Sequence, residues 1–94
     1  MRKIDWTPKS IRAFKRLIRK NPQLRPLAER ALRQLAENPF HPSLSTHKLV
    51  GDLSDIWSCS VDYKYRILFE FVKNPEAELE NILLLNIGSH DEVY

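Results

Sequence analysis

The stretch from Ser58 to Val72 constrains the fold of this chain more than any other part of the sequence. β-Branched and aromatic residues crowd it, and neither glycine nor proline interrupts it, which is typical of two strands joined by a tight turn. We expect strands over residues 55–61 and 65–72, the second of them nearly all apolar and therefore central in a sheet. The rest of the chain must then supply the layers that cover this hairpin.

Alternation near the turn of this hairpin separates two kinds of side chain. Tyr63 and Tyr65 share one parity, and Lys64 and Arg66 share the other, so a strand here would present a cationic face opposite an aromatic one. Two cations on one face of a rigid strand suit an anion. We therefore place the candidate site at this polar end of the sheet.

The length of 94 residues predicts a single domain over residues 1–94. No segment approaches the roughly 18 consecutive apolar residues of a membrane span, so we expect a cytoplasmic protein that does not associate with membranes. Cys59 is the one cysteine of the sequence, which excludes an internal disulfide. We expect it to be a small buried residue of a strand, not a nucleophile.

The net charge of +3 conceals a division of the chain. Residues 1–51 hold 12 Lys and Arg against 3 Asp and Glu, whereas residues 52–94 hold 3 against 9. A basic half of this density favours a polyanionic partner, and nucleic acid is the usual one. The alternative is an ordinary solvated helix face.

Two helices are predicted to precede the hairpin. Residues 3–6 alternate in polarity, and Thr7-Pro8 then supplies an N-cap and a proline at the first helical position. Apolar residues at helical spacing predict helices over 8–20 and 22–37. The first helix has no acidic residue, and its basic residues are Lys9, Arg12, Lys15, Arg16, Arg19 and Lys20.

The remaining segments complete an α+β domain. A loop of about ten residues, with His41 and His47 in or beside it, follows the second helix, and Gly51 allows a turn before the hairpin. A last strand is expected over residues 80–87, followed by a polar tail. The predicted fold is an N-terminal strand, a two-helix hairpin and a three-stranded antiparallel meander, which together form a four-stranded, largely antiparallel sheet.

Several familiar chemistries have no motif in this sequence. It contains no Gly-rich phosphate loop, no Cys pair, no His-x-x-x-His helix and no Gly-x-Ser-x-Gly elbow. The three histidines lack the local spacing of metal ligands, so we expect neither a metal nor a cofactor. The cations and aromatic residues that would converge, if the strand ends meet the tail, are His47, Tyr63, Lys64, Tyr65, Arg66, His90 and Tyr94.

This set of side chains fits RNA. The 2′-hydroxyl of RNA can attack its own phosphodiester, so a protein needs only a base, an acid and cations for the charge that develops on phosphorus. Histidine, with an ordinary pKa of about 6.5, can serve as base or acid. Aromatic rings could hold unstacked bases, although Tyr63 or Tyr65 could equally be strand packing.

Three segments support a family resemblance: Lys48-Leu-Val-Gly51, Tyr65-Arg-Ile-Leu-Phe69 and Ile87-Gly-Ser-His-Asp-Glu-Val-Tyr94. With the N-terminal strand and the basic helical hairpin, they resemble the RelE/ParE superfamily of toxins, and most of all its RelE and YafQ branches. The resemblance implies a RelE-like fold and an mRNA endonuclease that works in the A site of the small ribosomal subunit. It also implies a cognate antitoxin that silences the toxin in a hetero-oligomer.

The resemblance assigns catalytic residues by position. Arg66 matches the arginine of the RelE pattern Tyr-Arg-hydrophobic, and Tyr94 matches the aromatic residue that ends the family motif. His90 matches the YafQ histidine two places after the glycine, and His47 matches the one that precedes Leu-x-Gly. We expect His90 to be general acid or base, Tyr94 its partner or a stacking group, and His47 a substrate-binding residue or second proton carrier.

The hairpin departs from the YafQ pattern. Where YafQ has a histidine, an aspartate and a tryptophan, this sequence has Ser60, Lys64 and Tyr65. Lys64 restores a cation in RelE fashion and should share a phosphate with Arg66, so the predicted site is a hybrid. The residues expected to bind RNA without catalytic work are Arg12, Lys15, Arg16, Arg19, Lys48, Tyr63 and Tyr65.

Two other functions remain open at this point. One is a binding module of the ParE type, which resembles the same fold and poisons DNA gyrase without cleaving RNA. The other is an inactive remnant that only pairs with its antitoxin. The terminal pair His90 and Tyr94 favours the nuclease, because these groups are useful for chemistry or base stacking.

Overall fold

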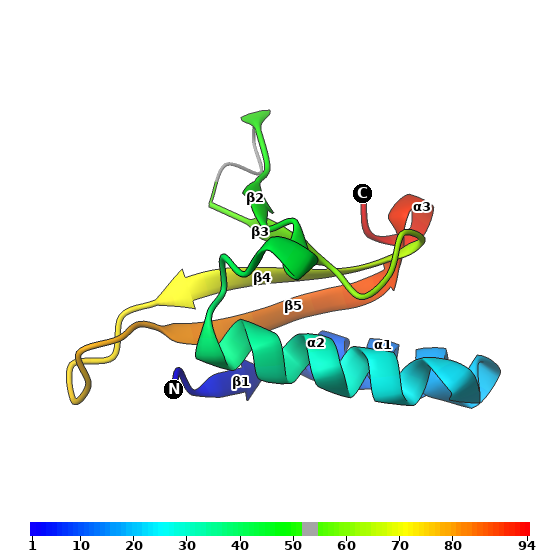
Figure 1. The fold of residues 1–94 in the computed structure, drawn as a ribbon, viewed down its shortest axis with the longest axis horizontal. Helices are drawn as coiled ribbons and strands as arrows, with labels where there is room; N and C mark the ends of the chain where they lie inside the picture. The colour runs from blue at the N-terminus through cyan, green and yellow to red at the C-terminus, as the bar shows by residue number, and fades with distance from the viewer. Residues whose placement is uncertain (52–54) are drawn as a thin grey trace.

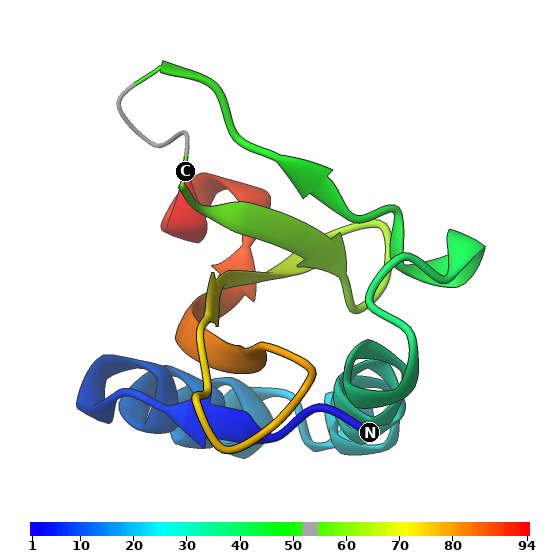
Figure 2. The ribbon, with the colours of Figure 1, turned by 90° about the vertical axis from the view of Figure 1, so that its left-hand side faces the viewer.

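The computed structural model describes residues 1–51 and 55–94. It contains one five-stranded sheet with two helices against one face (Figures 1 and 2). The elements in chain order are β1 (Ile4–Trp6), α1 (Pro8–Lys20), η1 (Pro22–Leu24), α2 (Arg25–Glu37), η2 (Pro42–Leu44), β2 (His47–Lys48), β3 (Trp57–Ser60), β4 (Tyr65–Val72), β5 (Asn81–Ser89) and α3 (His90–Val93).

The sheet is mixed, with strand order β1-β5-β4-β3-β2. β1 runs parallel to β5, and the other pairings are antiparallel. The α+β class and the meander β3-β4-β5 are therefore confirmed. The four-stranded count is wrong, because the short segment His47–Lys48 pairs with β3 as an additional edge strand.

The first helix has the bounds that its sequence predicts. Thr7 Oγ accepts a hydrogen bond from Ser10 N at 3.1 Å, and Ser10 Oγ accepts one from Thr7 N at 3.0 Å, so a capping box closes its N-terminus. The second helix begins later than predicted, at Arg25, after a 3₁₀ turn. Pro26 has no N–H, so it fits the first turn of a helix but not the interior of one that starts at residue 22.

The core lies between the helices and the face of the sheet that they cover, which we call the inner face. Ala28, Ala31 and Leu35 of α2 meet Phe69 and Ile82 of the central strands there, all 5% exposed or less. Cys59 is also fully buried in this core, as predicted. The opposite face, which we call the outer face, carries α3 and the C-terminus (Figure 1).

β5 changes its inward parity along its length. Ile82 and Leu84 are buried in the core, and Ile87, an odd number of residues beyond Leu84, is buried as well. A register shift between Leu68 and Phe69 of β4 accommodates the extra residue of β5, which is the signature of a β-bulge. The strand then runs on to Ser89, past the predicted end at residue 87.

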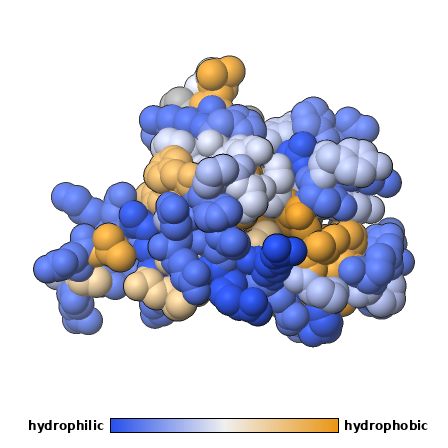
Figure 3. Space-filling model, in the orientation of Figure 1, coloured by the Kyte–Doolittle hydropathy of each residue, from blue (hydrophilic) through white to orange (hydrophobic). Residues whose placement is uncertain are grey.

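Most of the surface in the view of Figure 1 is hydrophilic (Figure 3). Apolar side chains gather in a hollow between α2 and the elements above it, which is lined by residues of α2, η2 and the end of β3. No helix in the described ranges is both long and apolar enough to cross a membrane.

Candidate functional site

The strand register carries two of the predicted site residues to the outer face. His47 on β2 pairs with Ser58 on β3, and, two residues along β3, Ser60 pairs with Arg66 on β4. Paired residues share a face of the sheet, whereas successive residues of a strand alternate. Cys59, between the two serines, points into the core, so His47 and Arg66 lie on the outer face.

The C-terminal tail folds over the same face. Ser89 caps α3, because its N–H donates to Glu92 Oε1 at 2.9 Å and Glu92 stands at the N3 position of a capping box. This turn allows the Tyr94 hydroxyl to form a hydrogen bond with Ser58 Oγ. The His90 and Tyr94 rings have centroids 4.5 Å apart. The outer-face cluster therefore comprises His47, Ser58, Arg66, His90 and Tyr94.

The guanidinium of Arg66 is anchored and still has donors to offer. Its Nη1 donates to the carbonyl oxygen of Tyr65 at 3.1 Å and to that of Asp62. These two bonds hold the side chain against the turn between β3 and β4. Within the described part of the chain, the other three guanidinium N–H groups make no hydrogen bond, so they can face an anion.

Lys64 lies outside both strands of the hairpin, in agreement with the predicted ranges 55–61 and 65–72. It belongs to the turn, where Asp62 Oδ1 accepts hydrogen bonds from the N–H groups of Lys64 and Tyr65 at 2.9 and 2.8 Å. Its ammonium nitrogen lies 5.4 Å from the centre of the Tyr65 ring, and that ring packs on the inner face. The prediction that Lys64 and Arg66 share one strand face is therefore wrong, because the strand begins only at Tyr65.

The two hairpin tyrosines have different environments. Tyr63 is 90% exposed in the turn, whereas Tyr65 packs against the core. Tyr65 is thus strand packing, as one of the pair was expected to be. Tyr63 is free to meet a ligand, and its predicted contact with RNA stays a prediction.

Four of the predicted RNA-binding cations lie on α1, away from the outer-face cluster. Arg12, Lys15, Arg16 and Arg19 are exposed on α1, which covers the inner face. Lys48 lies with its ammonium nitrogen 6.0 Å from the centre of the Trp57 ring. The predicted RNA-binding cations are therefore divided between α1 and the edge strand β2, where Lys48 follows His47.

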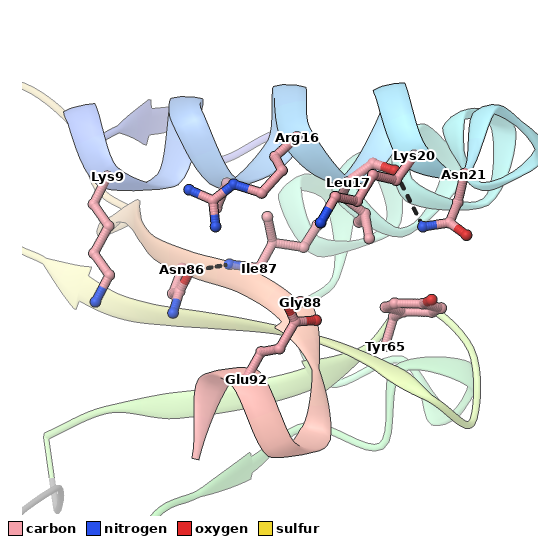
Figure 4. Close-up of a pocket in the computed structure, with 11 residues that line it drawn as sticks. Lys9, Arg16, Leu17, Lys20, Asn21, Tyr65, Asn86, Ile87, Gly88 and Glu92 are labelled. Carbon is pink, nitrogen blue, oxygen red and sulfur yellow. Dashed lines mark hydrogen bonds between the residues drawn. The ribbon is translucent and has the colours of Figure 1, made fainter.

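A cleft of about 380 Å³ separates α1 from α3, and we call it the α1–α3 cleft. Figure 4 shows its basic residues Lys9 and Arg16 pointing from α1 toward β5, where Asn86 lies, while Glu92 points from α3 toward α1. Lys20 also lines this cleft from α1. Charges of both signs thus meet in one hollow.

Two titratable groups have environments that shift their pKa. The pKa of Glu92 lies below its ordinary value, chiefly because the backbone N–H and side chain of Ser89 donate to its carboxylate, with smaller contributions from Lys20 and Arg16. Burial raises the pKa of the Cys59 thiol to about 12, against a smaller opposing effect of Arg66. Cys59 is therefore a protonated thiol at neutral pH and not a nucleophile.

The sequence alone does not indicate all of these residues. Ser58 was not singled out, although its parity with Ser60 and Arg66 in the hairpin pointed to the outer face. The spacing of Ser89 and Glu92 is that of a capping box, so the short helix α3 could have been predicted. Nothing in the sequence indicated that Asn86 would line the α1–α3 cleft, because its position there depends on the bulge in β5.

Among residues 1–51 and 55–94, no group of three or more His, Cys, Asp or Glu side chains could hold a metal ion. The expectation that the chemistry needs no metal stays a prediction.

A comparison with protein families finds a match along almost the whole chain. The family described as the ParE toxin of the type II toxin-antitoxin system, parDE, matches residues 4–94. A search of curated proteins finds no significant match.

Solved toxin structures share the fold at low sequence identity. The YoeB/ParE toxin from Agrobacterium tumefaciens has a TM-score of 0.77 at 17% identity, over 94% of this chain and 98% of that one. A metal-bound toxin from Helicobacter pylori has a TM-score of 0.78 at 24% identity, over 100% of both chains. A chain of the E. coli DinJ-YafQ complex has a TM-score of 0.78 at 10% identity, over 100% of this chain and 99% of that one. These likenesses concern the fold.

Proposed function

This chain belongs to the ParE toxin family of type II toxin-antitoxin systems, within the RelE/ParE superfamily, and on that premise we propose that it is a ribosome-dependent mRNA endoribonuclease. The observation that supports the proposal is the outer-face cluster. It gathers two imidazoles, a phenol and an anchored guanidinium on one surface of the sheet. These are the groups that metal-free cleavage of RNA needs.

The proposed reaction is attack by the 2′-hydroxyl of a ribose on the adjacent phosphorus. A general base takes the proton of that hydroxyl, and the new O–P bond forms as the bond to the 5′-oxygen breaks. A general acid protonates the departing 5′-oxygen. The products are a 2′,3′-cyclic phosphate and a 5′-hydroxyl, and no oxidant, metal or cofactor enters the balance.

Each member of the cluster has a role in this proposal. Arg66, whose other three guanidinium N–H groups have no hydrogen-bond partner among residues 1–51 and 55–94, stabilises the charge that develops on the phosphoryl oxygens. His90 is exposed and in ring contact with Tyr94, so it can exchange protons with a substrate as acid or base. Tyr94 orients that imidazole or stacks on a base, and His47, exposed on the neighbouring edge strand, serves as the second proton carrier.

A second candidate function is poisoning of DNA gyrase. It is favoured by the family description, which is that of a ParE toxin. Such a toxin would need no general acid or base, so substitution of His90 would leave its effect on gyrase unchanged. The two candidates are therefore separable by one set of variants.

A cognate antitoxin is part of the proposal. YafQ, whose fold this chain shares, was crystallised with DinJ. We propose that an acidic and apolar partner segment likewise covers this basic chain, in a toxin-antitoxin hetero-oligomer. A toxin that acts on ribosomes and mRNA works in the cytoplasm.

The test is inducible expression followed by primer extension on cellular mRNA, beside a gyrase supercoiling assay with the purified protein. We expect new mRNA ends and no effect on supercoiling. His90→Ala should lower cleavage by about 10² to 10⁴, while the matched variant His41→Ala, outside the cluster, should cleave normally. Loss of supercoiling with intact mRNA would instead establish the second candidate.

A further inference from the structure

We propose that the α1–α3 cleft is a binding site for the backbone phosphates of a single-stranded nucleic acid, separate from the outer-face cluster. The proposal rests on the proposed function for the choice of RNA as that nucleic acid. In this proposal Lys9, Arg16 and Lys20 bind the phosphates, and the Glu92 carboxylate competes with the phosphates for these cations.

The spacing of the three cations on α1 fits a chain of phosphates better than a lone anion. Lys9, Arg16 and Lys20 follow one another at intervals of seven and four residues and line the same cleft. Eleven residues of helix rise about 16 Å. A stacked nucleic-acid strand has one phosphate about every 3.4 Å, so this row of cations can follow several consecutive phosphates.

The uncharged groups of the cleft are also suited to a nucleotide. Asn21 and Asn86 contribute amide groups, and Tyr65 also lines the cleft, with the part of its ring that the core leaves exposed. Amides can bond to phosphate or base edges, and an aromatic ring can stack on a base. A polyglutamate peptide could use the cations and the amides, but it has no ring to stack on Tyr65.

Glu92 allows a test of the cleft in which RNA affinity is expected to increase, not decrease. Its carboxylate points across the cleft from α3 and interacts with Lys20 and Arg16. A phosphate must compete with this carboxylate for the same cations. Glutamine at position 92 would remove the negative charge and could still cap α3, because the capping box accepts Glu or Gln at N3.

The experiment measures binding of the full chain to a fluorescent 2′-O-methyl RNA oligonucleotide, which cannot be cleaved by 2′-hydroxyl attack. Arg16→Ala with Lys20→Ala should weaken binding about tenfold. It should also lower the slope of log K against log salt by about 1.4, as expected for two lost phosphate contacts. The matched control is Arg30→Ala with Arg33→Ala, which removes the same charge from exposed positions of α2.

The Glu92→Gln variant should bind the oligonucleotide severalfold more tightly, and Glu37→Gln on α2 should not. Equal losses for the two double variants would overturn the proposal, as would unchanged or weaker binding by Glu92→Gln. A DNA oligonucleotide and a polyglutamate peptide of equal charge complete the test. Preferred binding of either one, with the same dependence on Arg16 and Lys20, would refute RNA as the ligand.

Cleavage and binding can fail independently in this design. If the cleft variants lose RNA binding but the wild-type chain leaves mRNA intact, the proposed nuclease activity is wrong and the cleft assignment stands. If His90→Ala abolishes cleavage while Arg16→Ala with Lys20→Ala binds like the wild type, the cleft assignment is wrong and the nuclease stands.

Discussion

The hydrogen bond between Tyr94 and Ser58 gives a direct test of how the tail is held. Tyr94→Phe removes the phenolic hydroxyl and keeps the ring that contacts His90 at 4.5 Å. Ser58→Ala removes the other partner. The two variants therefore separate the bond itself from the aromatic contact.

The burial of the two partners sets the expected magnitudes. Ser58 is 0% exposed, so Tyr94→Phe leaves a buried hydroxyl without its partner and should cost about 1 to 3 kcal/mol of unfolding free energy. Tyr94 is 42% exposed, so in Ser58→Ala its hydroxyl can turn to water and the cost should be about 0.5 to 1.5 kcal/mol. The double variant leaves no buried orphan, so its cost should fall below the sum of the single costs by about 1 kcal/mol.

Urea unfolding of the four chains in a double-mutant cycle measures this coupling. Additive costs, within about 0.5 kcal/mol, would refute the bond. Cleavage assays on the same variants add a second readout. If the Tyr94 hydroxyl transfers a proton, Tyr94→Phe loses activity and Ser58→Ala keeps most of it; if the tail only needs to be held in place, the two variants lose activity in proportion to their costs in stability.

Four further predictions concern single residues: Thr7, Cys59, Glu92 and Gly88. Thr7→Ala should cost about 1 kcal/mol of unfolding free energy, because it opens the capping box of α1; urea unfolding measures it, and no change would contradict the cap. Cys59 should resist alkylation at pH 8 in the folded chain and react on unfolding, since its thiol is buried with a pKa of about 12; mass spectrometry follows the adduct. The lowered pKa of Glu92 means that its carboxylate stabilises the folded chain above the ordinary value of 4.5, and that this stabilisation is lost as the pH falls through the lowered value. Wild-type and Glu92→Gln chains should thus differ in stability at pH 6 and converge in acid. In Gly88→Ala the new Cβ would lie 3.3 Å from atoms of Glu92, so α3 should shift. The rate of cleavage should then fall, while the free energy of unfolding should change little.

Local sequence signals were enough to predict most of the fold. The bounds of α1 follow from Thr7, Pro8 and Asn21-Pro22, because caps and prolines act through neighbouring backbone groups. Pro26 also indicates the observed start of α2, because a residue without an N–H fits the first turn of a helix. β2 could not be predicted in this way, because a two-residue strand has no periodicity and forms only where β3 offers its edge.

The site was harder to predict than the fold. Parity along the hairpin correctly separates Arg66 from Tyr65, but it was extended into the turn, where Lys64 no longer alternates. On β5, Ile82 to Leu85 are all apolar, so the sequence did not show which of them faces the core. The bulge decides this, and the bulge depends on the pairing with β4.

The short helix α3 links the two sites. Tyr94 at its end reaches Ser58 on the outer face, and Glu92, two residues earlier, points into the α1–α3 cleft. The helix has only four residues and is held by the Ser89 cap, by the hydrogen bond that His90 N donates to the Lys64 carbonyl oxygen at 3.1 Å, by the Tyr94 bond and by the charges of Arg16 and Lys20. Since a nucleic-acid phosphate in the cleft would compete for those charges, its binding should loosen one of the restraints on the segment that carries His90. Under this proposal, occupancy of the cleft and the position of the imidazole are coupled, and variants of Glu92 should change both.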